Sequence, residues 1–398
     1  MANLFEPVQL GPATLRNRVI KAATFEGATP EGLVTDELID FHRKVAAGGV
    51  GMTTVAYLAV APEGRTHKEC IQLVPAALRG LQKLTDAIHA EGALAAAQVG
   101  HAGPVANASS NRAKSLSAGR MFNPLGLRFT KAADQADIDR VIQDYSRSAE
   151  IAVEAGFDSL EIHLGHNYLL SAFLSPQFNK RTDKYGGSIE NRARFAREVL
   201  SVVRDRVGDR AAVTVKLNMV DGYRGGLRIE DSIQVAKWLE EDQVVDAIEL
   251  TAGSSLANPM YLFKGDAPVK EFTGTLPWYL RAGFRMVGKK FLRVYPYEEG
   301  YFLPMARQFR EELTIPLILL GGIANLETAQ GAIDEGFEFV GMARALLYKP
   351  DLLLGYQDGT STTSGCIHCN RCMATIYTGT RCPLVDPRPG DRPIGVPD

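Results

Sequence analysis

Two histidines and a tyrosine lie within six residues of one another near the middle of the chain, as His163, His166 and Tyr168. Two imidazoles can donate hydrogen bonds to one carbonyl oxygen and so polarise a conjugated double bond, while a nearby phenol can deliver a proton. This arrangement favours hydride addition to an α,β-unsaturated carbonyl compound. Two alternatives are a histidine pair with purely structural hydrogen bonds and a metal site completed by a third ligand.

Glycines and an arginine follow the last two apolar runs of the chain, as Gly321-Gly322 and as Gly341 with Ala343-Arg344 two residues on. Backbone N–H groups at such glycines can approach a phosphate closely, and an arginine adds a positively charged guanidinium with paired N–H donors. The pattern predicts a phosphorylated ligand. The alternative is that the paired glycines only make tight turns.

Four of the five cysteines lie in one short segment near the C-terminus, as Cys366, Cys369, Cys372 and Cys382. Thiolates with this spacing bind either an iron–sulfur cluster or zinc, and His368 is a further candidate ligand. The alternative is that reduced cysteines pack in a C-terminal segment. The odd number and the clustering do not indicate a secreted disulfide framework.

All of these groups need a scaffold that brings the ends of several strands together. Short apolar runs alternate with longer amphipathic ones, as in strand–helix units around a parallel sheet, and about eight such runs are present. The sequence therefore predicts an α/β fold, a (β/α)8 TIM barrel whose active-site groups follow the strands on one face. The predicted strands are Val19–Ala23, Gly51–Ala56, Ala93–Gln98, Ser159–His163, Ala212–Leu217, Ala247–Leu250, Leu317–Leu320 and Phe339–Gly341.

We interpret residues 1–398 as one domain with two additions to the barrel. Residues 252–303, after the sixth strand, are too long for a plain connection and are interpreted as an inserted cap. Its Trp278, Tyr279 and Tyr295 are candidates for stacking on nicotinamide or substrate, with core packing as the alternative. Residues 360–398 are interpreted as a C-terminal cysteine segment and tail, and residues 167–190 as a long loop.

The overall composition restricts the class of protein. Apolar residues make up 45% and charged residues 23%, which is typical of a folded globular chain. The net charge of −2 offers no basic field, so neither nucleic acid nor a membrane is expected as a partner. No targeting segment and no long apolar stretch is evident, which favours a cytoplasmic protein. The lone Cys70 is interpreted as a small apolar core residue.

Several segments resemble the Old Yellow Enzyme family of FMN oxidoreductases, and the resemblance extends from Leu4 to about Cys382. The run that begins at Arg181 is highly specific. The segments are Asn17–Ile20 (NRVI), Gln98–Gly103 (QVGHAG), Leu174–Pro176 (LSP) and Asn179–Arg192 (NKRTDKYGGSIENR).

The resemblance implies a set of residues around FMN. Ala23 and Thr24 lie beside the flavin ring in this comparison, Gln98 bonds its pyrimidine edge, and Lys216 stands near N1, where it stabilises anionic reduced flavin. Phe25 stands where relatives carry a Thr or Cys that bonds the flavin, so noncovalent FMN is expected. The residues that match the family's phosphate-binding positions are Gly322, Ala343 and Arg344, in agreement with the glycine pattern.

The resemblance also implies the substrate groups. His163 and His166 match the pair that anchors the substrate, and Tyr168 matches the proton donor. Tyr57, where many relatives have a small residue, either narrows the substrate site or packs.

The cysteine segment resembles a branch of the family that includes dienoyl-CoA reductase and trimethylamine dehydrogenase, whose barrels hold a [4Fe-4S] cluster. The gap before Cys382 is shorter here, and the nucleotide-binding region that follows the barrel in that branch is not present in this sequence.

The function expected from residues and resemblance is an ene-reductase. NADH or NADPH reduces FMN and leaves, and a small activated alkene is then reduced in the same site; family members are commonly homo-oligomeric. One alternative is an iron–sulfur flavoenzyme served by a partner protein. Others are an aldolase-like barrel in which Lys216 forms a Schiff base, and a noncatalytic flavin-binding barrel.

Overall fold

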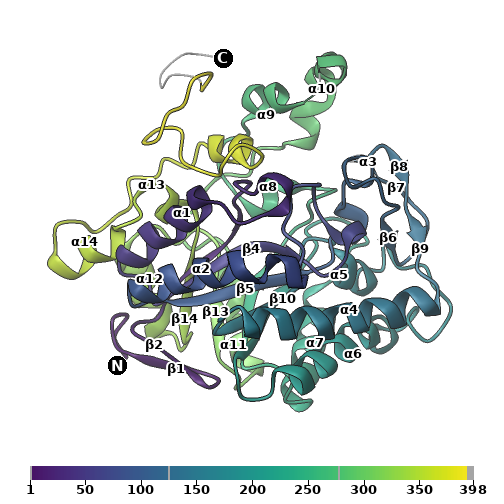
Figure 1. Cartoon of the computed structure of the whole chain (residues 1–398), viewed down its shortest axis with the longest axis horizontal. Helices are drawn as coiled ribbons and strands as arrows, with labels where there is room; N and C mark the ends of the chain where they lie inside the picture. The colour runs from purple at the N-terminus through teal and green to yellow at the C-terminus, as the bar shows by residue number, and fades with distance from the viewer. Residues whose placement is uncertain (1, 124–125, 277, 392–398) are drawn as a thin grey trace.

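The computed structural model describes residues 2–123, 126–276 and 278–391. Eight parallel strands close into a barrel in the order β10-β11-β12-β13-β14-β3-β4-β5, and helices surround it (Figure 1). This confirms the predicted (β/α)8 barrel. The barrel strands are β3 (Val19–Phe25), β4 (Met52–Ala59), β5 (Leu94–Gly100), β10 (Ser159–Leu164), β11 (Ala212–Asn218), β12 (Ala247–Thr251), β13 (Leu317–Leu319) and β14 (Phe339–Met342).

The outer helices begin where the sequence supplies capping side chains. Thr35 and Ser188 each accept a backbone N–H in the first turn of a helix, and Asp134 and Asp137 form a capping box. The apolar faces of these helices pack on the barrel in one large core cluster. The helices that cover the strands are α1 (Asp36–Ala47), α2 (Leu78–Ala90), α4 (Gln135–Glu154), α6 (Ile189–Val207), α7 (Ile229–Glu241), α11 (Leu303–Glu312), α12 (Leu326–Asp334), α13 (Arg344–Tyr348) and α14 (Leu352–Asp358).

A hairpin at the N-terminus closes one end of the barrel. Strands β1 (Val8–Leu10) and β2 (Ala13–Leu15) pair antiparallel, and Leu10 and Leu15 pack on residues near the start of the barrel strands, among them Ile20 and Met52. Small sheets, β6 (Leu116–Ser117) with β9 (Lys131–Ala132) and β7 (Phe122–Asn123) with β8 (Arg128–Phe129), lie in the connection between β5 and α4. The opposite end of the barrel is left for the site.

Two long connections after barrel strands contain helices. Helix α5 (Leu169–Leu174) forms within residues 167–190, so the expectation of one long loop there was wrong. Residues 252–303 hold α8 (Pro259–Leu262), α9 (Val269–Thr275) and α10 (Trp278–Phe291). The short helix η5 (Arg371–Thr375) lies in the cysteine segment. The other short helices are α3 (Ala108–Asn111), η1 (Pro30–Gly32), η2 (Pro62–Gly64), η3 (Pro75–Ala77) and η4 (Gly103–Val105). In the described part of the chain, no helix is long and apolar enough to cross a membrane.

Candidate active site

The two histidines and the tyrosine come together at the carboxyl end of β10. The rings of His163 and Tyr168 stack at 4.2 Å between centroids, and the rings of His163 and His166 meet edge to face at 5.1 Å. His163 is the second-to-last residue of β10, whereas Tyr168 is the N-cap of α5. The structure therefore places the three predicted side chains in one cluster.

A strained turn aims these rings. His166 and Asn167 both have positive φ, 58° and 60°, which residues with side chains rarely adopt in succession. Asn218 accepts the backbone N–H of His166 at 3.0 Å, and Asn167 donates to Asp221 at 3.1 Å. Thr251 at the end of β12 lies 2.9 Å from Nε2 of His166. These partners were not predicted, although each follows or ends a strand.

Hydrogen bonding and burial define the protonation of the imidazoles. Nδ1 of His163 accepts the backbone N–H of Gly165 at 3.0 Å, so in the neutral ring Nε2 carries the proton. Burial and the neighbouring positive charge of Lys216 lower the pKa of His166 to about 3, and burial also holds the pKa of His163 well below its ordinary value. Both rings are neutral at physiological pH.

Aromatic rings and a thiol form the wall beside Tyr168. The Tyr57 ring meets the Tyr168 ring edge to face at 5.4 Å, and the Tyr57 hydroxyl donates to the carbonyl of Gly64 at 3.0 Å. Cys70 packs in the same cluster and donates from its thiol to the carbonyl of Tyr57. Burial raises the pKa of Cys70 to about 12, so the group is an inert thiol at neutral pH.

The C-terminal segment reaches back to this wall, which the sequence did not predict. The backbone N–H of Thr380 donates to the carbonyl of Glu26 at 2.6 Å, and the ring of Tyr377 lies 6.1 Å from that of Phe25. A Cβ at Gly27 would meet the carbonyl oxygen of residue 376 at 1.8 Å, so only glycine permits this contact. Contacts between residues this far apart in sequence leave no local signal.

Charged side chains fill the barrel below the rings. Lys216 lies between the carboxylates of Glu161 and Glu249, 3.1 Å from the former and in a direct hydrogen bond to the latter. Gln98 donates to Glu161 at 2.6 Å. All four side chains are buried, with Gln98 the most exposed at 5%. Sequence reasoning found Lys216 and Gln98 and missed the two glutamates, which stand out as charges inside apolar strands.

Two carboxylates share one ammonium in this layer. Burial opposes the charge of Lys216, yet the attraction of Glu161 and Glu249 outweighs it and raises the lysine pKa. Burial and repulsion from Glu161 raise the pKa of Glu249 to about 8. A Schiff-base nucleophile must be a neutral amine, so the aldolase-like alternative for Lys216 does not fit this environment.

A second buried ion pair, also not predicted, lies at the end of β3. Lys21 contacts Glu26 at 2.7 Å and Thr24 at 2.8 Å, and Glu26 also accepts the backbone N–H of Ala56 at 3.1 Å. This network fixes Thr24 and the adjacent Ala23 at the barrel mouth.

The predicted phosphate residues lie at the ends of β13 and β14. Gly321 and Gly322 have φ of 107° and 77°, a conformation that favours glycine. Arg344, the first residue of α13, donates from Nη1 to the carbonyl of Lys264 at 2.9 Å and to Asn370 at 2.6 Å. Gly341 lies within β14, and Ala343 is the N-cap of α13.

The site has the donors and acceptors that FMN requires. A flavin presents carbonyl and imide groups on its pyrimidine edge, and the Gln98 amide and Lys216 ammonium lie in one layer of the barrel to meet them. Two glycines and an arginine offer N–H groups for a phosphate at the neighbouring strand ends. In the described part of the chain, Oε2 of Glu249 is buried without a hydrogen-bond partner. The residues present therefore fit this cofactor.

The four cysteines gather around Cys372. Burial and the nearby thiols of the other three cysteines together raise the pKa of Cys372 to about 12. All four are free thiols. Among residues 2–123, 126–276 and 278–391, no three His, Cys, Asp or Glu side chains stand in a geometry that could hold a metal ion. His368 stacks on Tyr297 at 3.3 Å instead.

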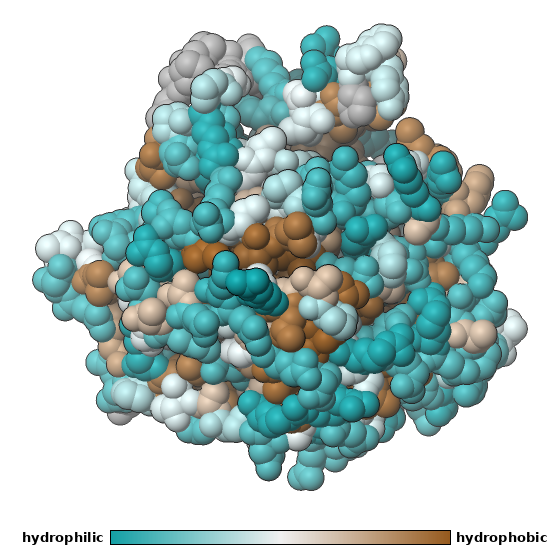
Figure 2. All heavy atoms as spheres, in the orientation of Figure 1, coloured by the Kyte–Doolittle hydropathy of each residue, from teal (hydrophilic) through white to brown (hydrophobic). Residues whose placement is uncertain are grey.

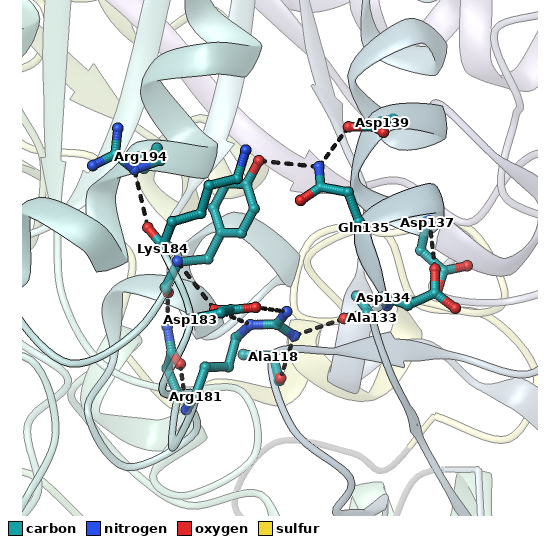
Figure 3. A network of polar contacts seen from close by, with 12 residues as sticks. Ala118, Ala133, Asp134, Gln135, Asp137, Asp139, Arg181, Asp183, Lys184 and Arg194 are labelled. Carbon is teal, nitrogen blue, oxygen red and sulfur yellow. Dashed lines mark hydrogen bonds and ion pairs between the residues drawn. The ribbon is translucent and has the colours of Figure 1, made fainter.

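The highly specific run after α5 has a structural role (Figure 3). Arg181 pairs with Asp183 and donates to the carbonyls of Ala118 and Ala133, at 3.1 and 2.6 Å. Arg194 donates to the carbonyl of Lys184 at 3.0 Å. The run thereby ties the connection after α5 to the segments around residues 118 and 133.

The stacking of the cap aromatic residues on nicotinamide or substrate stays a prediction, whereas the alternative of core packing is tested by their exposure. Trp278 is 81% exposed and Tyr279 is 63% exposed on α10, so core packing is wrong for both. Tyr295 packs edge to face on Tyr261 at 5.3 Å.

The barrel, its buried lysine and its glycine loops fit a flavin-dependent oxidoreductase. The chain belongs to the NADH:flavin oxidoreductase / NADH oxidase family, whose model matches residues 3–258. It is therefore an FMN-dependent NAD(P)H oxidoreductase of the Old Yellow Enzyme type.

Individual relatives differ in their activities. A 4,4'-dithiodibutanoate disulfide reductase from Rhodococcus erythropolis is 53% identical over 384 residues, which cover 96% of this chain and 95% of the relative. A metal reductase from Desulforamulus reducens is 30% identical over 95% of this chain, which spans about half (52%) of that relative. The structure of an Old Yellow Enzyme homologue from Zymomonas mobilis matches 96% of this chain and 98% of its own with a TM-score of 0.73 at 22% identity, a likeness of fold.

Proposed function

We propose that this chain is an ene-reductase that uses NADH or NADPH to reduce the activated carbon–carbon double bond of α,β-unsaturated carbonyl compounds. The observation that carries the proposal is the cluster of His163, His166 and Tyr168, in which two neutral imidazoles lie beside a phenol. Noncovalent FMN supplies the hydride in this chemistry. Ala23, Thr24, Gln98 and Lys216 hold its ring, and the phosphate is held by Gly321, Gly322, Gly341, Ala343 and Arg344.

The chain's own groups polarise the substrate and hold the proton. His163 donates from Nε2 to the substrate carbonyl oxygen, and His166, oriented by Thr251, donates to the same oxygen. Burial raises the pKa of Tyr168 well above its ordinary value, so the phenol keeps its proton until a carbanion forms at the substrate carbon. Tyr57 lies against Tyr168 and shapes the substrate side of the site.

A second candidate function is reduction of an organic disulfide. The observation that favours it is the 53% identical disulfide reductase, which aligns over nearly the full length of both chains. In that reaction hydride supplied by reduced FMN would convert one sulfur to a thiol as the S–S bond breaks, and Tyr168 would protonate the other sulfur, which leaves as a thiolate. The same cluster of His163, His166 and Tyr168 then serves either substrate. Whether an alkene or a disulfide enters the site depends on the space beside Tyr57 and Phe25.

Replacing Tyr168 with Phe tests the proposal by separating the two half-reactions. We expect anaerobic reduction of the flavin by NADPH or NADH to be nearly unchanged, and reoxidation by 2-cyclohexenone to slow about 10²-fold through loss of the general acid. Tyr279→Phe on the exposed face of α10 is the matched control. Equal losses in both half-reactions contradict the proton-donor role. Running the same assay with 4,4'-dithiodibutanoate decides between the two substrate classes.

We also propose that Cys366, Cys369, Cys372 and Cys382 hold a metal, either an iron–sulfur cluster or zinc. Their spacing and the closeness of the other thiols to Cys372 support this, and metal binding draws them into a coordinating arrangement that the described residues do not have without it. Iron, sulfide and zinc are measured on anaerobically purified protein and on Cys372→Ser, with Cys70→Ser as the control. We expect metal that is lost only in Cys372→Ser. Absence of bound iron and zinc from the unaltered chain refutes the proposal.

A further inference from the structure

Helices α9 and α10 form an arm that extends away from the barrel (Figure 1). The arm belongs to the connection after β12, and such connections in a parallel barrel open on the face that carries the site. Phe272 of α9 and Phe284 of α10 pack at 5.5 Å, and Phe284 meets Phe291 at 6.3 Å. A Cβ at Gly288 would lie 3.0 Å from Val269, so the glycine allows the two helices to approach closely.

The arm is fixed to the body of the protein at its base. Glu271 pairs with Arg371 of η5 at 3.3 Å, and Gly265 forms a bridge with Tyr295. The orientation of the arm is therefore set by the same C-terminal segment that contacts the wall of the site.

The outward face of α10 carries large apolar side chains in solvent. Trp278 and Met286 are 81% and 86% exposed, and Tyr279 and Val287 are also largely exposed. Positions 278, 282 and 286 lie four residues apart and so share one side of the helix. In the space-filling view the arm stands clear of the barrel, with pale and brown surface beside teal (Figure 2). Aromatic residues exposed in this way are uncommon on a face that stays in water.

The same helix is strongly basic. Residues 272–297 contain five lysines and arginines and no aspartate or glutamate, although the whole chain has a net charge of −2. Arg281, Arg285 and Lys289 follow one another at four-residue intervals and form a basic stripe beside the apolar one. A second copy of the chain is a poor occupant, because a two-fold contact between α10 helices would place these stripes against each other.

We propose that the outward face of α10 binds an anionic phospholipid surface. A basic stripe beside exposed Trp, Tyr and Met side chains is the composition of an interfacial helix, in which the apolar groups enter the headgroup region and the cations meet lipid phosphates. The expectation of no membrane contact rested on the net charge, whereas this local charge has the opposite sign. Because the arm rises on the site face, attachment holds the barrel mouth toward the bilayer.

The test measures sedimentation of the FMN-loaded protein with vesicles of phosphatidylcholine alone and with 30 mol% phosphatidylserine. We expect binding only to the anionic vesicles and weaker binding as salt rises. Arg285→Gln with Lys289→Gln should lower the partition coefficient about 25-fold, at about fivefold for each basic residue removed. The matched control is Arg79→Gln with Lys83→Gln, two exposed basic residues four apart on α2.

Trp278→Ser provides an independent variant. In the unaltered chain, the indole fluorescence of Trp278 reports the same event directly. A blue shift of the Trp278 emission on anionic vesicles is expected, and the other tryptophan, Trp238, gives no such shift because it packs against Arg197. Equal binding to both vesicle types, or no binding, overturns the proposal. A concentration-dependent dimer that Trp278→Ser abolishes also overturns it, because the face is then an interface between proteins.

Discussion

The shared ammonium in the barrel has a measurable consequence for stability. Glu249 is fully buried, and its pKa is raised from the ordinary 4.5 to about 8. Between these two values the folded chain keeps a proton that the unfolded chain has released, so stability falls as pH rises. The loss accumulates at about 1.36 kcal/mol for each pH unit between pH 6 and the folded-state pKa, and it is complete by pH 9. Over this range the one group costs the folded state roughly 3 kcal/mol. The Glu249→Gln variant, which matches the protonated form in shape, should lack this loss.

The assay is urea unfolding of the FMN-loaded protein at pH 6, 7.5 and 9. Glu249→Gln should equal the unaltered chain within about 1 kcal/mol at pH 6 and exceed it by roughly 3 kcal/mol at pH 9. Glu230→Gln, whose side chain is 71% exposed, controls for loss of a carboxylate and should leave the pH dependence unchanged. If the unaltered chain and Glu249→Gln lose stability in parallel as pH rises, Glu249 is not the group that holds the proton.

The remaining predictions concern ligand binding and the thiol. Changing His163 and His166 together to Ala removes two hydrogen bonds to the bound oxygen, and binding of p-hydroxybenzaldehyde, followed by its charge-transfer band, should weaken about 30-fold; unchanged affinity means that the pair is structural. Cys70→Ser should retain turnover of both alkene and disulfide within about twofold, because a thiol with a pKa of about 12 is not a nucleophile at neutral pH. Loss of only the disulfide activity in Cys70→Ser shows thiol exchange instead.

The barrel itself could be predicted from the sequence. All eight predicted strands form, and most extend one to three residues past the predicted end because pairing with the neighbouring strand continues; β4, for example, pairs with β5 through Ala59. Helix α5 was missed because all six of its residues are buried, so no polar face marks it as a helix.

Only some residues of the candidate site could be predicted from the sequence. Side chains that follow strands, such as His163 and Tyr168, are found by the rule that βα connections share one face. Glu161 and Glu249 carried a signal that was not used, since a charge inside an apolar strand must point into the barrel and find a partner. Tyr377 carried none, because its place beside Phe25 depends on the path of the whole C-terminal segment.

The central claim is that one flavin site accepts electrons from a nicotinamide and passes them to a polarised double bond. The most direct measurement is the visible spectrum of the purified protein, taken anaerobically as NADPH or NADH is added and then as 2-cyclohexenone is added. The account predicts flavin absorbance that bleaches with the nicotinamide and returns with one equivalent of enone. A protein that FMN cannot reconstitute, or a reduced flavin that no enone reoxidises, contradicts it.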